Sequence, residues 1–179
     1  HLEAYTPGEQ PQDMVYIKLN TNESPYPAAP QVVAAIDSSQ VENLRLYSDP
    51  DSKPLVRKLA QTYGVLPENI FVSNGSDDIL NFAFMAFCDE NHPVVFPDLT
   101  YGFYSVFADL YRIPYTKIPL KEDFSLNVED YLGLNKTIFI ANPNAPTGLA
   151  LSLSQIETIV KSNPDNVVVI DEAYVDFGG

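Results

Sequence analysis

The sequence has little of what disulfides, metal sites and membrane spans require. Its 179 residues include one cysteine, Cys88, and two histidines, His1 and His92. A single cysteine excludes an intramolecular disulfide, and the two histidines lack the spacing of metal ligands, so we expect no bound metal. No apolar stretch approaches the roughly 18 residues of a membrane span, and no signal peptide opens the chain. These absences favour a cytoplasmic protein without a membrane partner.

Basic residues are also scarce. Ten lysines and arginines stand against 24 aspartates and glutamates, which gives a formal net charge of −14. This charge disfavours nucleic acid as a partner. It does not disfavour a phosphorylated ligand, because backbone N–H groups at the start of a helix bind phosphate without positive side chains. Hydrophobic residues are abundant, at 45%, and indicate a packed globular protein.

Local patterns along the chain change from an irregular arm to alternating helices and strands. Residues 1–30 are rich in Pro, Asn and Tyr and predict an N-terminal arm, with Val15–Leu19 as its strand-like piece. A helical pattern begins at about Ala28, and further helices are predicted over Ser52–Tyr63, Asp77–Phe87, Tyr101–Tyr111 and Asn127–Leu132. Ser154 and Glu157 form a predicted capping box for a last helix, which runs to about Lys161. Strands are predicted at Ile70–Ser73, Val94–Phe96, Tyr115–Ile118, Thr137–Ala141 and Val167–Ile170.

The alternation of short apolar strands with helices predicts the fold class. It is typical of an α/β domain with a mostly parallel sheet that is flanked by helices and buried on both faces. In such sheets ligands bind beyond the carboxyl ends of the strands. Three polar motifs follow predicted strands, so we expect a binding site at that edge of the sheet.

The first motif is SNGSDD, Ser73–Asp78, at a change from strand to helix. Gly75 permits a tight turn and the next N–H groups open the helix, so Ser76 and Asp77 could hold a phosphate. On its own, the motif is better explained as an ordinary capped turn, because glycine turns of this kind are common.

The second motif is ANPNAPTG, Ala141–Gly148, directly after the apolar strand. Two prolines and a glycine hold an irregular backbone there, and Asn and Thr side chains can point into a cleft. An ordinary Pro- and Asn-rich loop would explain any four of these residues, but it explains all eight less well.

The third motif is VVVIDEAYVDF, Val167–Phe177. A carboxylate that directly follows buried apolar residues is costly unless a cation meets it. We therefore expect Asp171 to face a protonated ring nitrogen. Tyr174 follows three residues later, a spacing that allows its side chain to reach the same site. The alternative is a surface acid at the point where the strand leaves the sheet.

Together the motifs carry a resemblance to a known family. NGSDD, NPNAPTG and DEAYVDF, with YTPGEQP, KLNTNESPYP and RLYSDP upstream, resemble the N-terminal half of fold-type I pyridoxal-phosphate enzymes, and specifically the histidinol-phosphate aminotransferases. The resemblance implies a fold-type I aminotransferase-like sheet. Residues 31–179 would form an incomplete large domain that binds the cofactor, and residues 1–30 would be an N-terminal arm and small-domain segment.

The resemblance also implies roles for single residues. Asp171 would pair with the pyridinium nitrogen of pyridoxal 5'-phosphate and keep it protonated, and Tyr174 would hydrogen-bond the phenolic oxygen. The backbone at Ser76 and Asp77 would bind the phosphate. Further matches are Tyr101, stacked on the ring; Tyr47, reaching the phosphate of the partner's cofactor in a homodimer; and Tyr5 and Asn22, near the substrate.

In one position the sequence departs from the family. The family often has asparagine directly before PTG, where its amide binds the phenolic oxygen, and this sequence has Ala145 there. Either Asn144 or Asn142 takes over this contact, or Tyr174 acts alone.

The family's Schiff-base lysine, in a Ser-rich string downstream of DEAY, has no match in the sequence. We expect this lysine and the arginines that hold the substrate beyond Gly179, so the chain by itself should be inactive. The full-length enzyme would convert L-histidinol phosphate and 2-oxoglutarate to imidazole acetol phosphate and glutamate, a step of histidine biosynthesis. The lysines present are Lys18, Lys53, Lys58, Lys117, Lys121, Lys136 and Lys161.

Two alternatives stay open. A threonine-phosphate decarboxylase or another small-substrate aminotransferase would look similar over this half, with the same fold and cofactor. A non-catalytic module for dimerisation or phospholigand binding would suit an acidic chain without the lysine, but it leaves the Asp171 and Tyr174 pair without a purpose.

Overall fold

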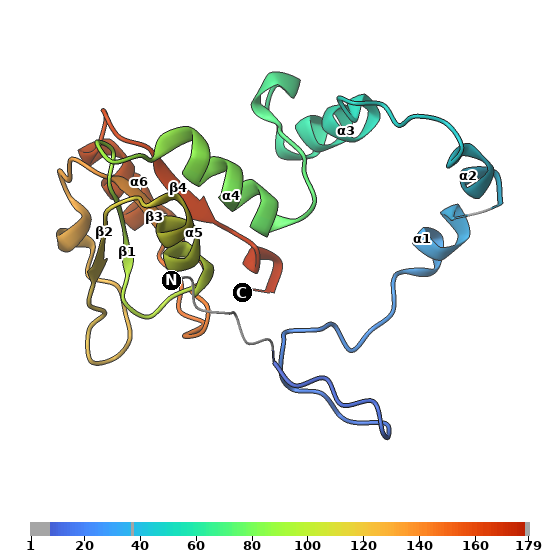
Figure 1. Ribbon diagram of the computed structural model, residues 1–179, viewed down its shortest axis with the longest axis horizontal. Coiled ribbons are helices and arrows are strands. Elements are labelled where there is room, and N and C mark those ends of the chain that lie inside the picture. Colours follow the sequence, from blue (N-terminus) through green and yellow to red (C-terminus); the bar gives the residue numbers. More distant parts are fainter. Residues whose placement is uncertain (1–7, 37, 178–179) are drawn as a thin grey trace. The chain divides into compact units, whose positions relative to one another are not determined.

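A computed structural model describes residues 8–36 and 38–177 of the chain (Figure 1). The chain divides into two units, the first ending at Phe71 and the second beginning at Val72. The first contains α1 (Pro30–Ala35), α2 (Ser38–Asn43), α3 (Lys53–Tyr63) and the 3-10 helix η1 (Pro67–Asn69). The second contains α4 (Ser76–Phe87), β1 (Val94–Pro97), α5 (Phe103–Tyr111), β2 (Tyr115–Ile118), η2 (Val128–Tyr131), β3 (Thr137–Ala141), α6 (Leu153–Ser162), β4 (Val168–Asp171) and η3 (Val175–Phe177).

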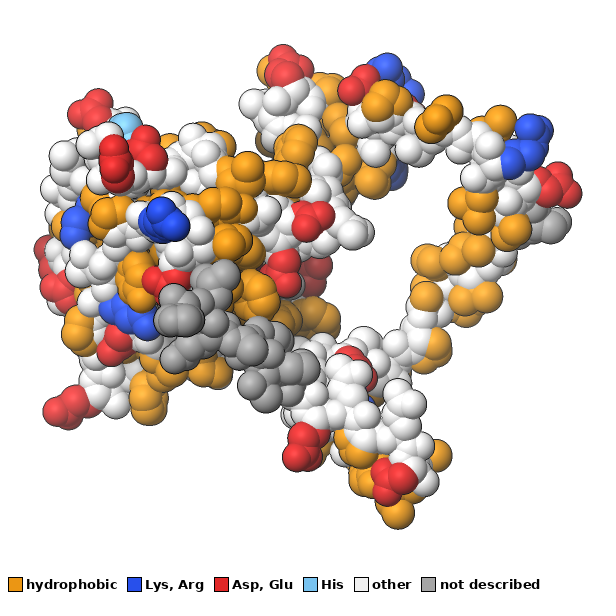
Figure 2. Space-filling model, viewed as in Figure 1, with side chains coloured by type: hydrophobic (Ala, Val, Ile, Leu, Met, Phe, Trp, Pro, Cys, Tyr) orange, Lys and Arg blue, Asp and Glu red, His pale blue; other side chains and the backbone are white. Residues whose placement is uncertain are grey.

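The first unit buries little of its apolar surface. Ala60 is the one buried residue of α3, and hydrophobic side chains are visible over much of the unit in Figure 2. Folded domains normally bury such residues in a core. The packing energy of the described chain therefore comes mainly from the second unit. Large apolar residues exposed in the first unit include Val15, Ile17, Leu19, Val32, Val33, Ile36, Leu44, Leu46, Tyr47, Leu55 and Tyr63.

Two strand predictions were wrong, at Val15–Leu19 and at Ile70–Ser73, where the structure has no strand. Ile70 has extended backbone angles, φ −111° and ψ 123°. An extended segment becomes a strand only when a neighbour exchanges backbone hydrogen bonds with it, and the described residues supply no such neighbour for either segment. The helix predicted over Ser52–Tyr63 is confirmed as α3, which ends at Gly64 in a left-handed conformation.

The second unit is built on a four-stranded sheet in the order β2-β1-β3-β4. All three pairings are parallel, as predicted. The chain places β2 on one side of β1 and then β3 on the other side. The strand order thus reverses between β1 and β3, and in open α/β sheets ligands bind at the carboxyl ends of strands next to such a reversal.

Helices cover both faces of the sheet, as predicted, and the central strands β1 and β3 are buried, whereas the edge strand β2 is largely exposed. One core cluster joins α4 and α5 to one face through Phe84, Phe107 and Phe139. The other joins η2 and α6 to the opposite face through Tyr131, Ile138 and Ile159. Figure 1 shows the sheet between these two layers of helices. The alternation of side chains along β3 explains this, because neighbouring residues point to opposite faces.

Two helix predictions needed correction. Residues Asn127–Leu132 form only the short 3-10 helix η2. Helix α6 is capped by Ser152 and Gln155 rather than by Ser154 and Glu157: the backbone N–H of Gln155 donates to Ser152 Oγ (3.3 Å), and that of Ser152 donates to Gln155 Oε1 (2.9 Å). Ser152 has the extended backbone of a helix cap, whereas Ser154 already lies within the helix.

Tyr131 gives a stability prediction. Its side chain is fully buried, and its hydroxyl has no hydrogen-bond partner among the described residues. An unsatisfied buried hydroxyl is destabilising, so Tyr131→Phe should leave the free energy of unfolding unchanged or raise it by about 1 kcal/mol. Urea denaturation of the full-length protein measures this, and a loss above about 1 kcal/mol would mean that the hydroxyl has a partner.

Candidate functional site

A cavity of about 50 Å³ lies at the carboxyl ends of β3 and β4. Ala141 and Asp171 are the last residues of these two strands. The first residue of α4 and the segment between β1 and α5 complete the lining. Sequence segments that are far apart therefore converge where the strand topology predicts a ligand. The lining residues are Ser76, Tyr101, Ala141, Pro143, Ala145, Asp171, Ala173 and Tyr174.

Four of the predicted cofactor residues line this one cavity: Ser76, Tyr101, Asp171 and Tyr174. A fifth, Asp77, is joined to it, because the Tyr101 hydroxyl donates to Asp77 Oδ1 at 2.6 Å. The structure thus brings together the SNGSDD and DEAYVDF motifs, which are almost 100 residues apart in the chain.

Both carboxylate oxygens of Asp171 accept hydrogen bonds. The Tyr104 hydroxyl donates to Oδ2 at 2.8 Å, and the backbone N–H of Ala173 donates to Oδ1 at 3.1 Å. No ion pair involves Asp171 among the described residues. Two ionised oxygens offer about four acceptor positions, so the carboxylate can still accept a bond from a cationic group in the cavity.

Tyr104 is the donor of this pair because of its surroundings. Its side chain is fully buried. Burial, and then the negative charge of Asp171, raise the pKa of the Tyr104 hydroxyl above its ordinary value. Tyr104 is therefore a neutral hydroxyl at physiological pH, and it donates its proton to the Asp171 carboxylate.

Helix α4 begins at the cavity with its first N–H groups uncapped by a side chain. The preceding residue, Gly75, has φ 84° and ψ 179°, a conformation that is open almost only to glycine. The first N–H groups of a helix have no acceptor within the helix, and the helix dipole favours an anion there. Ser76, the first helical residue, lines the cavity.

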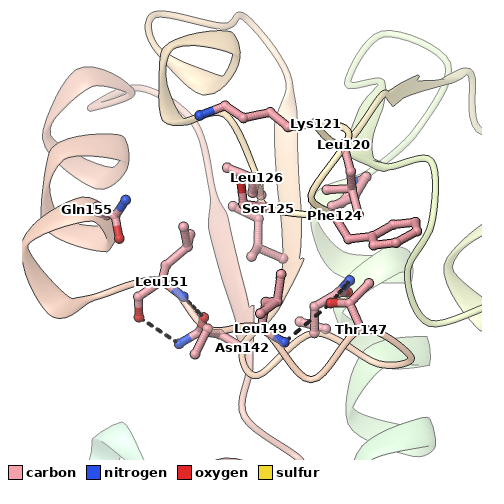
Figure 3. A pocket seen from close by; sticks show the side chains of 15 residues that line it. Leu120, Lys121, Phe124, Ser125, Leu126, Asn142, Thr147, Leu149, Leu151 and Gln155 are labelled. Atoms are coloured by element: carbon pink, nitrogen blue, oxygen red, sulfur yellow. Dashed lines mark hydrogen bonds between the residues drawn. The ribbon is translucent and has the colours of Figure 1, made fainter.

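Asn142 and Asn144 of the second motif line a neighbouring cavity of about 140 Å³, and Figure 3 shows Asn142 among its lining residues. Asn142 Oδ1 accepts from the backbone N–H of Leu151 at 2.6 Å. Asn144 Oδ1 accepts from the Thr100 hydroxyl at 2.7 Å, and its amide donates to Leu99 O and Thr147 Oγ1. Neither asparagine lines the cavity that contains Asp171, and Ala145 does.

The remaining predicted residues precede the second unit in the sequence. Tyr47 and Asn22 belong to the first unit, so their positions near the cofactor or substrate stay predictions. Tyr47 is fully exposed. Asn22 has φ 54°, in the left-handed region that asparagine tolerates. Tyr5 lies outside the described residues.

Sequence reasoning missed Tyr104 and Ala173, the two hydrogen-bond donors to the Asp171 carboxylate. Tyr104 follows Tyr101 by three residues at the start of α5, so a shared helix face was the only available signal. A backbone donor such as Ala173 leaves no signature in a sequence.

The described residues contain neither a metal site nor a membrane-spanning helix. No group of three or more His, Cys, Asp or Glu side chains in residues 8–36 and 38–177 could hold a metal ion. Over the same residues, no helix has the length and apolarity to cross a bilayer.

Comparisons with known proteins point to one family. The family model described as aminotransferase class I and II matches residues 15–179. The histidinol-phosphate aminotransferase of Brachyspira hyodysenteriae is 53% identical over 98% of this chain and 50% of its own length. The chain thus spans about half the length of the curated relatives it matches.

Solved structures agree with this match. The histidinol-phosphate aminotransferase of Sinorhizobium meliloti, in complex with pyridoxal-5'-phosphate, has a TM-score of 0.79 at 25% identity, over 87% of this chain and 44% of that one. The L-threonine-O-3-phosphate decarboxylase of Porphyromonas gingivalis has a TM-score of 0.64 at 27% identity, over 76% and 44%. The matched segment contains the whole parallel sheet and every residue of the Asp171 cavity, and the chain belongs to the class I and II aminotransferase family.

Proposed function

We propose that the full-length protein containing this chain is a pyridoxal-phosphate-dependent aminotransferase of histidine biosynthesis. It transfers the amino group of L-histidinol phosphate to 2-oxoglutarate. The observation that carries the proposal is the cavity in which Asp171, Tyr174, Tyr101 and the start of α4 meet. The substrate rests on the relatives of about half identity that carry this name.

The residues of the cavity fit the cofactor. Asp171 is an anion without a cationic partner among the described residues, and its oxygens are oriented by two donors. A carboxylate in this position stabilises a protonated ring nitrogen. The cavity itself is much smaller than a complete small-molecule site of roughly 300 Å³ or more. The lining residues therefore form one side of the proposed site.

Bound pyridoxal phosphate supplies an electron sink for a carbanion of the substrate. The role of Asp171 is to hold a proton at the ring nitrogen, which this chemistry needs. Tyr174 donates a hydrogen bond to the phenolic oxygen. Asn142 and Asn144 are committed to Leu151 and Thr100, so we assign this contact to Tyr174 and not to an amide. Asn144 would reach the cofactor only after leaving Thr100.

Tyr101 would cover one face of the ring. Its hydroxyl is held by Asp77, and its ring stacks on Phe103 with centroids 5.6 Å apart. A side chain fixed at both ends loses little entropy when a ligand stacks on it. The phosphate is held by backbone N–H groups at Ser76 and Asp77, because these donors are uncapped and lie at the positive end of the helix dipole.

Substitution of Gly75 tests the phosphate site. An alanine at φ 84° and ψ 179° is strained by about 1–3 kcal/mol, and relief of this strain would turn the first N–H groups of α4. We expect Gly75→Ala to raise the dissociation constant for pyridoxal phosphate by about tenfold, which corresponds to about 1.4 kcal/mol.

Gly102→Ala is the matched control for Gly75→Ala. Gly102 precedes α5 with φ −62°, an ordinary helical value, and an added Cβ would meet no atom within 4 Å at either glycine. We expect this variant to bind the cofactor like the wild type. Equal affinity of the Gly75 and Gly102 variants would contradict the assignment of the phosphate to this turn.

The remaining parts of the proposal come from the family resemblance. Tyr47 reaches the phosphate of the partner's cofactor in a homodimer, and Tyr5 and Asn22 contact the substrate. Residues 1–30 belong to the arm and small domain, and residues 31–179 to the cofactor-binding large domain. The Schiff-base lysine and the substrate-binding arginines lie in the half of the relatives' length that this chain does not span. The enzyme works in the cytoplasm.

The test uses the full-length protein with added pyridoxal phosphate. We expect bound cofactor to give a new absorption band. Borohydride should then convert the bound cofactor to a permanent lysine adduct. Glutamate should then form from L-histidinol phosphate and 2-oxoglutarate. Absence of both the band and the adduct would contradict the proposal and favour a non-catalytic module. Release of carbon dioxide from threonine phosphate, without glutamate formation, would instead favour the decarboxylase, which the similarity to the P. gingivalis enzyme keeps as the second candidate.

A further inference from the structure

Tyr104 connects two residues of the proposed cofactor site from within the core. It lies on α5, and its side chain is fully buried against the sheet. Its hydroxyl nevertheless reaches Asp171, 67 positions later in the sequence, at the end of β4. A hydrogen-bond partner stabilises a buried tyrosine hydroxyl, and a carboxylate is the stronger kind of acceptor.

The ring of Tyr104 is held on several sides. It packs on Phe96 and Phe139 of the sheet, with centroids 5.8 Å and 5.7 Å away. It also meets the Tyr101 ring edge to face, at 5.8 Å and 84°. A ring packed in this way keeps a single rotamer. The position of the hydroxyl is therefore set by the core and does not depend on a ligand.

The Asp171 carboxylate has two fixed donors, one for each oxygen. Tyr104 holds Oδ2 from the side of α5, and the N–H of Ala173 holds Oδ1 from the chain that follows β4. Two donors at different oxygens define the plane of the carboxylate. Loss of the Tyr104 donor would leave it free to rotate about the remaining bond.

We propose that Tyr104 is the positioning residue of the site, holding the Asp171 carboxylate and the Tyr101 ring in the orientation that receives the cofactor. The inference rests on the proposed function, because it takes Asp171 and Tyr101 to face the cofactor ring. Tyr104 does not touch the cofactor, and it acts through these two neighbours.

The experiment measures the dissociation constant of pyridoxal phosphate for the full-length protein. Tyr104→Phe removes one hydroxyl and keeps the buried ring. We expect this constant to rise about tenfold, as for other residues that hydrogen-bond a ligand-binding side chain and orient it without contacting the ligand. Tyr131→Phe is the matched control, because it also removes a fully buried tyrosine hydroxyl but one without a partner among the described residues. Its dissociation constant should stay within about twofold of the wild type.

A double-mutant cycle separates positioning from a general structural role. If Tyr104 acts through Asp171, Tyr104→Phe should change the dissociation constant by less than about twofold in the Asp171→Asn background. Unfolding midpoints of the cofactor-free variants show whether each is folded. Should Tyr104→Phe fold poorly, Tyr104→Met fills the same space with an adaptable apolar side chain and carries the same expectation.

Two results would overturn the inference. One is an affinity of Tyr104→Phe within about twofold of the wild type, and the other is the same tenfold loss in the Asp171→Asn background. Wild-type protein that binds no pyridoxal phosphate would overturn the proposed function itself. Failure of the inference alone is thus recognised by a wild type that binds the cofactor.

Discussion

Asp171→Asn in the full-length protein is expected to lower kcat/KM for transamination by between about 100-fold and 5,000-fold. This corresponds to about 3–5 kcal/mol, the usual loss when one partner of a buried ion pair is removed. Asparagine keeps the size of the side chain but cannot balance a protonated ring nitrogen. The measurement is steady-state formation of glutamate from L-histidinol phosphate and 2-oxoglutarate at saturating cofactor.

Asp165→Asn is the matched control for this variant. Asp165 lies just before the amino end of the same strand, β4. Its side chain is exposed and lines neither of the two cavities. The same chemical change at the opposite end of the strand should leave kcat/KM within about twofold, since surface substitutions cost about 0.5 kcal/mol or less. An Asp171→Asn variant with more than a tenth of wild-type activity would disprove the assigned role.

Phe139→Ala should have the largest effect on stability. Phe139 is fully buried in the middle of β3, where it stacks on Phe84 with centroids 4.3 Å apart and packs on Tyr104. Alanine would leave a cavity between the sheet and α4, and such changes cost about 3–5 kcal/mol. We expect the free energy of unfolding of the full-length protein to fall by this amount in urea denaturation.

The control for Phe139→Ala removes an equally large side chain from the surface. Phe124 lies in the loop before η2 and is 55% exposed. Phe124→Ala should change the free energy of unfolding by less than about 1 kcal/mol. Similar losses for the two variants would mean that the β3 core is not the main source of stability.

Much of the second unit was predictable from local patterns. The strands predicted at Val94–Phe96, Tyr115–Ile118, Thr137–Ala141 and Val167–Ile170 correspond to strands β1 to β4 within a residue or two. Continuous apolar runs such as Thr137–Ala141 indicate strands buried on both faces, and the burial of β1 and β3 between the two core clusters confirms this. The family followed from six motifs in order, and the comparisons confirm it.

The wrong predictions have two physical causes. The segment Ile70–Ser73 has a strand-like composition but pairs with no strand among the described residues, and the pairing of a strand depends on residues far away in the sequence. At α6, both Ser152 and Ser154 are followed three residues later by a possible capping partner. The backbone before the helix decides between them, and the extended conformation of Ser152 makes it the cap.

The sequence by itself determined the α/β class, the family and the identity of the polar residues at the strand ends. These follow from side-chain chemistry and from periods of a few residues, both of which are local. Only the tertiary structure decided the strand order and the convergence of Ser76, Tyr101 and Asp171 on one cavity. It also turned the loop asparagines toward the neighbouring cavity and buried Tyr104 behind Asp171. Contacts of this kind join segments far apart in the chain, and their geometry depends on the packing of the whole core rather than on any local pattern.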